Sequence, residues 1–249
     1  MHLSSRKFGC TFLAAVASLV TIHSSTPVFA APTKAAAKST PQSKRAKQVT
    51  DALYRHLKGR FSSPGGKMHL TIKPGSRADL GHFSLISVGG KPAKVRKLRI
   101  SEVAMKASNV RINVSELLRN NELVTLQSNT KLRAVVSEND LTTLLSQGKH
   151  TKDMGLRVRY VGDRMHVTGN FRLGWFSGPI SGVGKLRLGA DNKVFFDILS
   201  LKLNGAEAPQ PVKNKFSEKI NPVIDYNDIP FRPRFKSLKF KGPFAILTA

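Results

Sequence analysis

The sequence is poor in cysteine, with a single one, Cys10, among 249 residues. That residue lies in an N-terminal segment that we expect to be removed, so the mature chain has no thiol. Disulfide bonds, cysteine-based metal sites and cysteine nucleophiles are therefore excluded. The fold must be stabilised by its core alone, and a chain of this length buries enough surface for that.

Long apolar runs are scarce as well. The longest covers residues 12–22, roughly 11 residues, whereas a membrane-spanning helix needs about 20. Arg6 and Lys7 precede this run, and the small-residue exit Val-Phe-Ala follows it at 28–30, which completes the three zones of a secretory signal peptide. We predict a signal peptide over residues 1–30 and export to the periplasm or cell envelope. An uncleaved transmembrane anchor is the alternative.

Acidic residues are also few: there are 15, against 41 lysines and arginines, and the formal net charge is +26. Arg6 and Lys7 are the only charged side chains of the predicted signal peptide, so its removal leaves +24. Such a surface attracts anionic phospholipid head groups, acidic envelope polymers and nucleic acid. Because export separates the protein from nucleic acid, we expect an anionic membrane surface or an envelope polymer as partner and no nucleic acid. A role in solubility alone is the plainer alternative.

Residues 31–45 contain no apolar residue larger than alanine or proline and no acidic residue, which predicts a basic, disordered linker. The rest of the chain, 46–249, is predicted to be one domain. A cationic amphipathic helix is expected over about 43–61, because apolar residues recur there at a spacing of four. Its apolar stripe consists of Val49, Leu53, Leu57 and Phe61. This helix either docks on the domain's own sheet, the commoner arrangement, or lies on a membrane surface.

Beyond residue 66, apolar and polar residues alternate with a period of two, which is typical of half-buried antiparallel strands with one wet, basic face. The predicted strands cover 95–100, 110–114, 132–136, 156–160, 171–175 and 194–203. Two short helices interrupt them. One follows a capping-box pattern at Ser137, and the other runs from about Val212 to Ile220 and ends at Asn221-Pro222. The predicted fold class is α+β, with one long curved antiparallel β-sheet.

No segment shows a pattern typical of catalysis. The glycines of 174–185 fit neither a phosphate loop nor a nucleophile elbow, and they indicate bends in curved strands. The 7 histidines are scattered, without the spacing of a zinc motif. Asp225 and Asp228 either bond their own backbone in a turn or share a catalytic or calcium site. We predict the turn, and hence no catalytic residue, no metal site and no cofactor; a hydrolase would need both aspartates and a histidine in one cleft.

Three stretches resemble the LmeA-like phospholipid-binding proteins of bacterial envelopes. They are ASNVRINVSELLRNNELV at 107–124, AVVSENDLTTLL at 134–145 and KINPVIDYNDIPFRPRFKSLKFKGPFAIL at 219–247. The shared features are Ser115-Glu116-Leu117-Leu118, Ser137-Glu138-Asn139-Asp140-Leu141, Asn221-Pro222 and Ile229-Pro230-Phe231. The resemblance extends from about residue 67 to the end. It implies a tubular lipid-binding (TULIP-like) half-barrel, in which the sheet wraps the N-terminal helix and leaves an apolar groove for acyl chains.

We therefore expect an exported, non-enzymatic phospholipid-binding protein of the cell envelope, which either sequesters or carries lipid. The residues expected to contact acyl chains are Leu53, Leu57, Phe61, Trp175, Phe176, Phe195 and Phe216. The residues expected at the lipid head group are Arg157, Arg159, Arg172 and Lys185. For the first set the alternative is a purely structural place in the core, and for the second a solvated strand face. The alternative function is a structural or interaction protein whose basic face binds acidic envelope polymers or anionic membranes, and a large apolar cavity would favour lipid instead.

Overall fold

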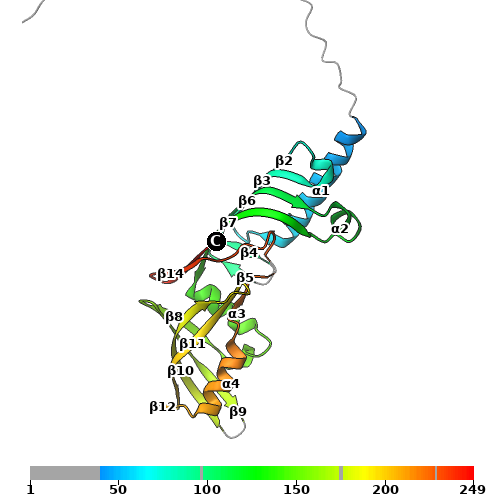
Figure 1. Ribbon diagram of the computed structural model, residues 1–249. Helices are drawn as coiled ribbons and strands as arrows, with labels where there is room; N and C mark the ends of the chain where they lie inside the picture. Colours follow the sequence, from blue (N-terminus) through cyan, green and yellow to red (C-terminus); the bar gives the residue numbers. More distant parts are fainter. Residues whose placement is uncertain (1–39, 96–97, 174–175, 228) are drawn as a thin grey trace, which may run out of the picture. The chain divides into compact units, whose positions relative to one another are not determined.

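A computed structural model describes residues 40–249 apart from 96–97, 174–175 and 228 (Figure 1). The predicted signal peptide, 1–30, and the greater part of the predicted linker, 31–45, lie outside the described residues. All described residues belong to one compact unit.

The first helix, α1, spans Pro41–Arg60. The Thr40 hydroxyl caps it by accepting a hydrogen bond from the backbone N–H of Ser43 at 3.3 Å. Pro41 follows in the first turn, where its fixed φ favours a helix and its missing N–H leaves no bond unmade. Residues 41–45, predicted to end the disordered linker, therefore form the first turn of this helix instead.

The apolar stripe of α1 is docked on the rest of the fold. Val49, Leu53 and Leu57 are 0 % exposed, and Phe61, just after the helix, is 2 % exposed. The lysines and arginines of the helix lie outside this stripe and are exposed or, for Arg60, partly so. Of the two arrangements open from the sequence, the structure has the helix packed on its own domain.

Three further α-helices lie in the described residues: α2 (Val114–Arg119), α3 (Glu138–Gln147) and α4 (Gln210–Ile220). The described residues also contain two single turns of 3-10 helix, η1 (Ala78–Leu80) and η2 (Lys152–Met154). The predicted capping box at the start of α3 is confirmed. The Ser137 hydroxyl accepts from the Asp140 N–H at 3.1 Å, and the Asp140 carboxylate accepts from the Ser137 N–H at 3.0 Å.

The strands that the structure describes form three antiparallel sheets (Figure 1). In the first sheet the order is β14 (Ser237–Lys241), β15 (Phe244–Thr248), β7 (Thr125–Ser137), β6 (Glu102–Ile112), β3 (His82–Lys91) and β2 (Lys67–Pro74). In the second sheet it is β12 (Ala206–Glu207), β11 (Lys193–Leu203), β10 (Phe176–Leu188), β9 (Arg164–Leu173) and β8 (Arg157–Val161), with β13 (Ile224–Asp225) also on β11. A small third sheet contains β1 (Phe61–Ser62), β4 (Ala93–Val95) and β5 (Leu98–Ile100).

The fold is thus α+β and antiparallel, but the single long sheet predicted from the alternation is divided. Between β7 and β8 the chain forms α3 and η2, and β8 pairs with β9 rather than with β7. The predicted strand at 95–100 is likewise a hairpin, in which Val95 of β4 lies opposite Leu98 of β5. Alternation reports which side chains face the core, and it carries no information about which strand lies alongside.

Of the glycines predicted to bend a strand, Gly178, Gly182 and Gly184 lie in β10, and Gly174 lies outside the described residues. The register between β10 and β11 shifts between Val183 and Gly184, which marks a bulge. A Cβ at Gly184 would lie 2.3 Å from the Asp197 carbonyl oxygen, so only glycine allows the two strands this close approach. The prediction of a bend is confirmed at this position.

One continuous cluster of buried apolar side chains extends through both six-stranded sheets and the helices. The rings of Tyr160 on β8 and Phe240 on β14 lie with their centroids 5.1 Å apart, which joins the second sheet to the first. Among the described helices, none combines the length and the apolar character needed to cross a membrane.

Candidate functional site: an apolar cavity beside α3 and α4

A mainly apolar cavity of the described residues has a volume of about 760 Å³. It lies where the ends of α3 and α4 meet the hairpin of β4 and β5 and the segment that contains β13. Its apolar wall consists of Val95, Leu98, Leu144, Leu145, Ile220, Pro222, Val223, Ile224, Tyr226 and Ile229. Polar residues at 148–151, 218, 219, 221 and 225 complete the lining. This size and this balance of apolar wall and few polar groups are typical of small-molecule sites.

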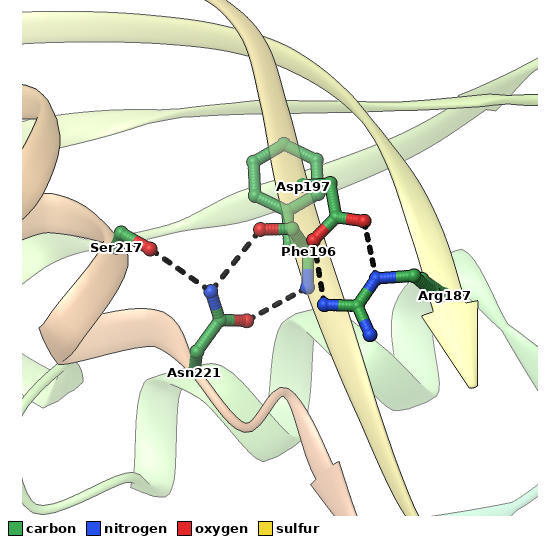
Figure 2. A network of polar contacts seen from close by, with 5 residues as sticks. All are labelled: Arg187, Phe196, Asp197, Ser217 and Asn221. Atoms are coloured by element: carbon green, nitrogen blue, oxygen red, sulfur yellow. Dashed lines mark hydrogen bonds and ion pairs between the residues drawn. The ribbon is translucent and has the colours of Figure 1, made fainter. Parts of the chain in front are cut away.

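One wall is fixed by Asn221, which caps the C-terminus of α4 (Figure 2). Its side-chain oxygen accepts from the Phe196 N–H at 2.7 Å, and its side-chain nitrogen donates to the Phe196 carbonyl at 3.1 Å. The same nitrogen donates to the Ser217 hydroxyl oxygen at 3.1 Å. Phe196 lies on β11, so a single amide holds the end of α4 to β11 of the second sheet. The cavity wall at 220–224 starts from this fixed point.

The opposite wall is the turn after α3. Thr151 is 2 % exposed, and its hydroxyl donates to the carbonyl of Leu145. The backbone N–H of Thr151 donates to the Gly148 carbonyl at 3.2 Å, which closes the turn. Leu144 and Leu145 on the last turns of α3 therefore keep a fixed position at the cavity.

Tyr226 is an unusual lining residue, because its hydroxyl is buried and has no hydrogen-bond partner among the described residues. The residue is 1 % exposed, and burial raises the pKa of its phenol, so it remains a neutral donor. The ring is held against Phe235 with centroids 4.4 Å apart. A buried hydroxyl without a partner costs about 1–3 kcal/mol of folding free energy.

Cations lie among the polar lining residues. Lys149 is exposed and Lys219 partly buried, and neither forms an ion pair within the described residues. The Lys219 ammonium group lies 5.5 Å from the centre of the Phe171 ring, a cation–π distance. The neighbouring Glu218 is already paired with Lys215 at 2.7 Å. Two ammonium groups are thus available beside an apolar cavity.

The residues predicted to contact acyl chains lie elsewhere. Leu53, Leu57 and Phe216 are buried in the core and do not line this cavity, and Phe61 lines a smaller one of about 480 Å³ beside β2. Phe195 is partly buried, with the Arg187 guanidinium 5.3 Å from its ring centre. Trp175 lies outside the described residues. Phe176 begins β10, and its side chain lies outside the description too.

The four residues predicted at the head group share one surface, the exposed face of the second sheet. Arg157 and Arg159 on β8, Arg172 on β9 and Lys185 on β10 all point to that face, as the strand register requires. Lys185 pairs with Asp163 at 2.8 Å. None of the four lines the cavity. The structure brings the four together on a solvated strand face, which was the alternative to a head-group site. Their contact with a lipid head group stays a prediction.

The Asp225 carboxylate accepts a hydrogen bond from the Asn227 N–H at 2.9 Å, the turn predicted for this segment. Asp228 lies outside the described residues. Asp225 and His150 both line the cavity, but the described residues show no hydrogen bond or ion pair between them. The described residues also contain no group of three side chains suited to a metal ion.

The sequence model of the LmeA-like phospholipid-binding family matches residues 80–242, well over half of the chain. The chain belongs to the LmeA-like phospholipid-binding family. The resemblance drawn from three short stretches is therefore confirmed. Searches among curated proteins and among solved structures return no match.

Every residue that lines the cavity falls inside the region shared with the LmeA-like family, whereas α1 precedes it. Sequence reasoning used Asn221-Pro222 as a landmark of the family and overlooked that its neighbours form a cavity wall. A signal was present: Val223, Ile224 and Tyr226 are apolar residues that follow a helix end without the length of a core strand.

Proposed function

We propose that this protein binds phospholipid in the cavity beside α3 and α4 and carries it without catalysing a reaction. The cavity of about 760 Å³ is the observation that supports this most directly. Ligand sites of about 300–1,000 Å³ with apolar walls are typical for lipids and other small molecules. A filled interior would instead have favoured a purely structural protein.

In this proposal an acyl chain lies against the apolar wall formed by Leu144, Val223 and Ile224. Removing its methylene groups from water supplies the main part of the binding free energy, about 0.8 kcal/mol for each buried methylene. The phosphate of the head group lies near the Lys149 and Lys219 ammonium groups, which supply charge without needing a rigid geometry.

Export and the membrane setting belong to the same proposal. We infer that residues 1–30 are cleaved and that the basic protein works at anionic membrane surfaces of the envelope, and the intact mass of the secreted chain would test the cleavage site. We also infer that the sheets and α1 form a tubular lipid-binding arrangement. The antiparallel sheets and the buried stripe of α1 support it.

The decisive experiment is native mass spectrometry of the full chain purified from its host, with lipid extraction. The wild type is expected to carry phospholipid, and Leu144→Trp to lose at least about 90 % of it because the indole fills the cavity. Leu199→Trp is the matched control, because Leu199 is 55 % exposed on β11 and does not line the cavity. Wild-type protein without phospholipid, or equal loss in both variants, would overturn the proposal.

A second variant tests the role of Tyr226. Tyr226→Phe keeps the ring and removes the unpaired hydroxyl, so the lipid-free protein is expected to gain about 1 kcal/mol of stability. Lipid affinity is expected to change less than about threefold, because the buried hydroxyl has no surface open to the cavity. Denaturation of delipidated protein and titration with short-chain phosphatidylglycerol measure the two effects. A loss of affinity of more than about tenfold would instead mean that the hydroxyl binds the ligand directly.

A further inference from the structure

A second cavity, a groove of about 1390 Å³, lies over the exposed face of the first sheet and along residues 231–236. It shares no lining residue with the lipid cavity. Five exposed cations line it: Lys106, Lys131, Arg232, Arg234 and Lys236. We propose that this groove binds an acidic polysaccharide chain, at a site separate from the lipid.

The cations of the groove lack counter-charges. None of the five forms an ion pair within the described residues. The one acidic side chain among the described lining residues, Asp191, is already paired with Lys193 at 2.8 Å. The field in the groove is therefore positive, and concave walls concentrate it.

Two of the groove's lysines, Lys106 and Lys131, repel each other and so reduce the stability of the sheet. Lys106 on β6 lies directly opposite Lys131 on β7, with both side chains on the exposed face. Like charges in directly opposed strand positions destabilise a sheet. A bound carboxylate between the two ammonium groups would convert this repulsion into attraction. Ligand binding would therefore explain why two lysines face each other, which packing does not explain.

The segment that forms the other side of the groove is held in a strained conformation. Phe231 and Arg232 have φ of 65° and 41°, in the left-handed region that residues other than glycine rarely occupy. The Phe231 carbonyl accepts from the Ser128 and Thr130 hydroxyls, each at 3.3 Å, which ties the segment to β7. The strained turn directs Arg232 and Arg234 to the groove that Lys106 and Lys131 also line.

The remaining lining distinguishes a polysaccharide from other polyanions. Neutral hydroxyl and amide groups alternate with the cations: Ser108, Thr125, Gln127, Asn129, Asn192 and Asn227. The side-chain amides of Gln127, Asn129 and Asn192 form no hydrogen bond within the described residues and are free to bind sugar hydroxyls. A flat membrane surface cannot enter a groove, so its fit is poorer than that of a linear chain.

Nucleic acid fits less well for a different reason. Single strands are bound through bases stacked on exposed aromatic rings. Phe231 is 3 % exposed, and the ring of Phe235 is partly buried against Tyr226, so the described lining of the groove offers no fully exposed aromatic ring.

Binding of polygalacturonate to the full chain, measured by calorimetry at low salt, tests the inference. The double variants Lys106→Gln/Lys131→Gln and Arg232→Gln/Arg234→Gln are expected to bind at least about tenfold more weakly. The control Lys239→Gln/Lys241→Gln removes the same charge from exposed positions of the same sheet outside the groove, and is expected to change affinity less than about twofold. Phospholipid content should be normal in all three.

Equal weakening in all three double variants would mean that the polymer binds through net charge alone. That result would overturn the proposal that the groove is the binding site. Equal or tighter binding of polyglutamate or single-stranded DNA would overturn the ligand class. Loss of binding to phosphatidylglycerol vesicles in the groove variants, with no wild-type binding to polygalacturonate, would assign the groove to the membrane. Because lipid content is measured in parallel, a failure of the groove is distinguishable from a failure of the lipid cavity.

Discussion

At the scale of the residue, Asn221 connects a helix end, a sheet and the cavity. Asn221→Ala removes its three side-chain hydrogen bonds to Phe196 and Ser217 and leaves the Phe196 backbone groups without this partner. We expect the free energy of unfolding to fall by about 2 kcal/mol, measured by chemical denaturation. Retained phospholipid should fall as well, because the wall at 220–224 is no longer fixed.

Two variants sharpen this prediction. Asn221→Asp keeps an acceptor for the Phe196 N–H but places a carboxylate against the Phe196 carbonyl, so it should not restore stability. Asn214→Ala removes an exposed asparagine of the same helix, whose bond to Gln210 stays within α4, and should cost less than about 0.5 kcal/mol. A loss for Asn214→Ala as large as that for Asn221→Ala would contradict the role of Asn221.

The sequence predicted local chemistry better than it predicted location. The cap at Ser137, the bend at Gly184 and the turn at Asp225 depend on neighbours within a few residues or on one adjacent strand, and all three are present. Phe195 and Phe216 could contact a ligand only if a cavity lay beside them, and the sequence does not show where cavities lie. Large apolar side chains look the same in a filled core and at a cavity, so the sequence could not separate them.

At the scale of the element, the helices were predictable and the sheet order was not. A helix carries its own signals, as the spacing of Leu53 and Leu57 shows, and both are buried as expected for docking. A strand needs a partner that the alternation does not name, so β7 and β8 looked like neighbours in one sheet. The start of α1 at Pro41 was readable from the Thr-Pro pair, but a linker was predicted from composition instead.

The strands of the first sheet are tied by Glu102 on β6. Its carboxylate pairs with Lys91 of β3 and with Arg133 of β7, each at 2.9 Å. The hydrogen bond from Lys91, together with Arg133, holds the pKa of Glu102 below its ordinary value of 4.5. A carboxyl whose pKa is lowered by folding stabilises the protein above its unfolded pKa, and this contribution is lost as the pH falls through the folded pKa.

We therefore expect Glu102→Gln to reduce the free energy of unfolding by about 1 kcal/mol at neutral pH. The difference from wild type should shrink as the pH falls below about 4, because the wild-type carboxyl then also becomes neutral. Urea denaturation at a series of pH values measures this. Glu116→Gln, whose carboxylate accepts only from Asn120 on its own helix, is the control. A difference that stays constant with pH would show that the Glu102 charge contributes nothing.

At the scale of the whole molecule, the net charge was readable from composition, but its distribution was not. Ion pairs such as Lys185 with Asp163 and Arg187 with Asp197 neutralise part of the exposed face of the second sheet. The groove of the first sheet keeps its cations unpaired among the described residues. Pairing depends on which strands become neighbours, so the location of free charge follows from topology and not from sequence order.

The unpaired cations of the groove and the apolar wall of the lipid cavity predict two different responses to salt. Binding of the full chain to phosphatidylglycerol vesicles, measured by co-sedimentation, should weaken by at least about tenfold between 0.05 and 0.5 M salt, because a chain of formal net charge +26 acts through screened, long-range attraction. Phospholipid already held in the cavity should remain bound over the same range, because burial of apolar surface is not screened. Vesicles of phosphatidylcholine serve as the neutral control. Salt-insensitive binding to anionic vesicles would instead mean that apolar side chains insert into the bilayer, and the basic surface would lose its proposed role.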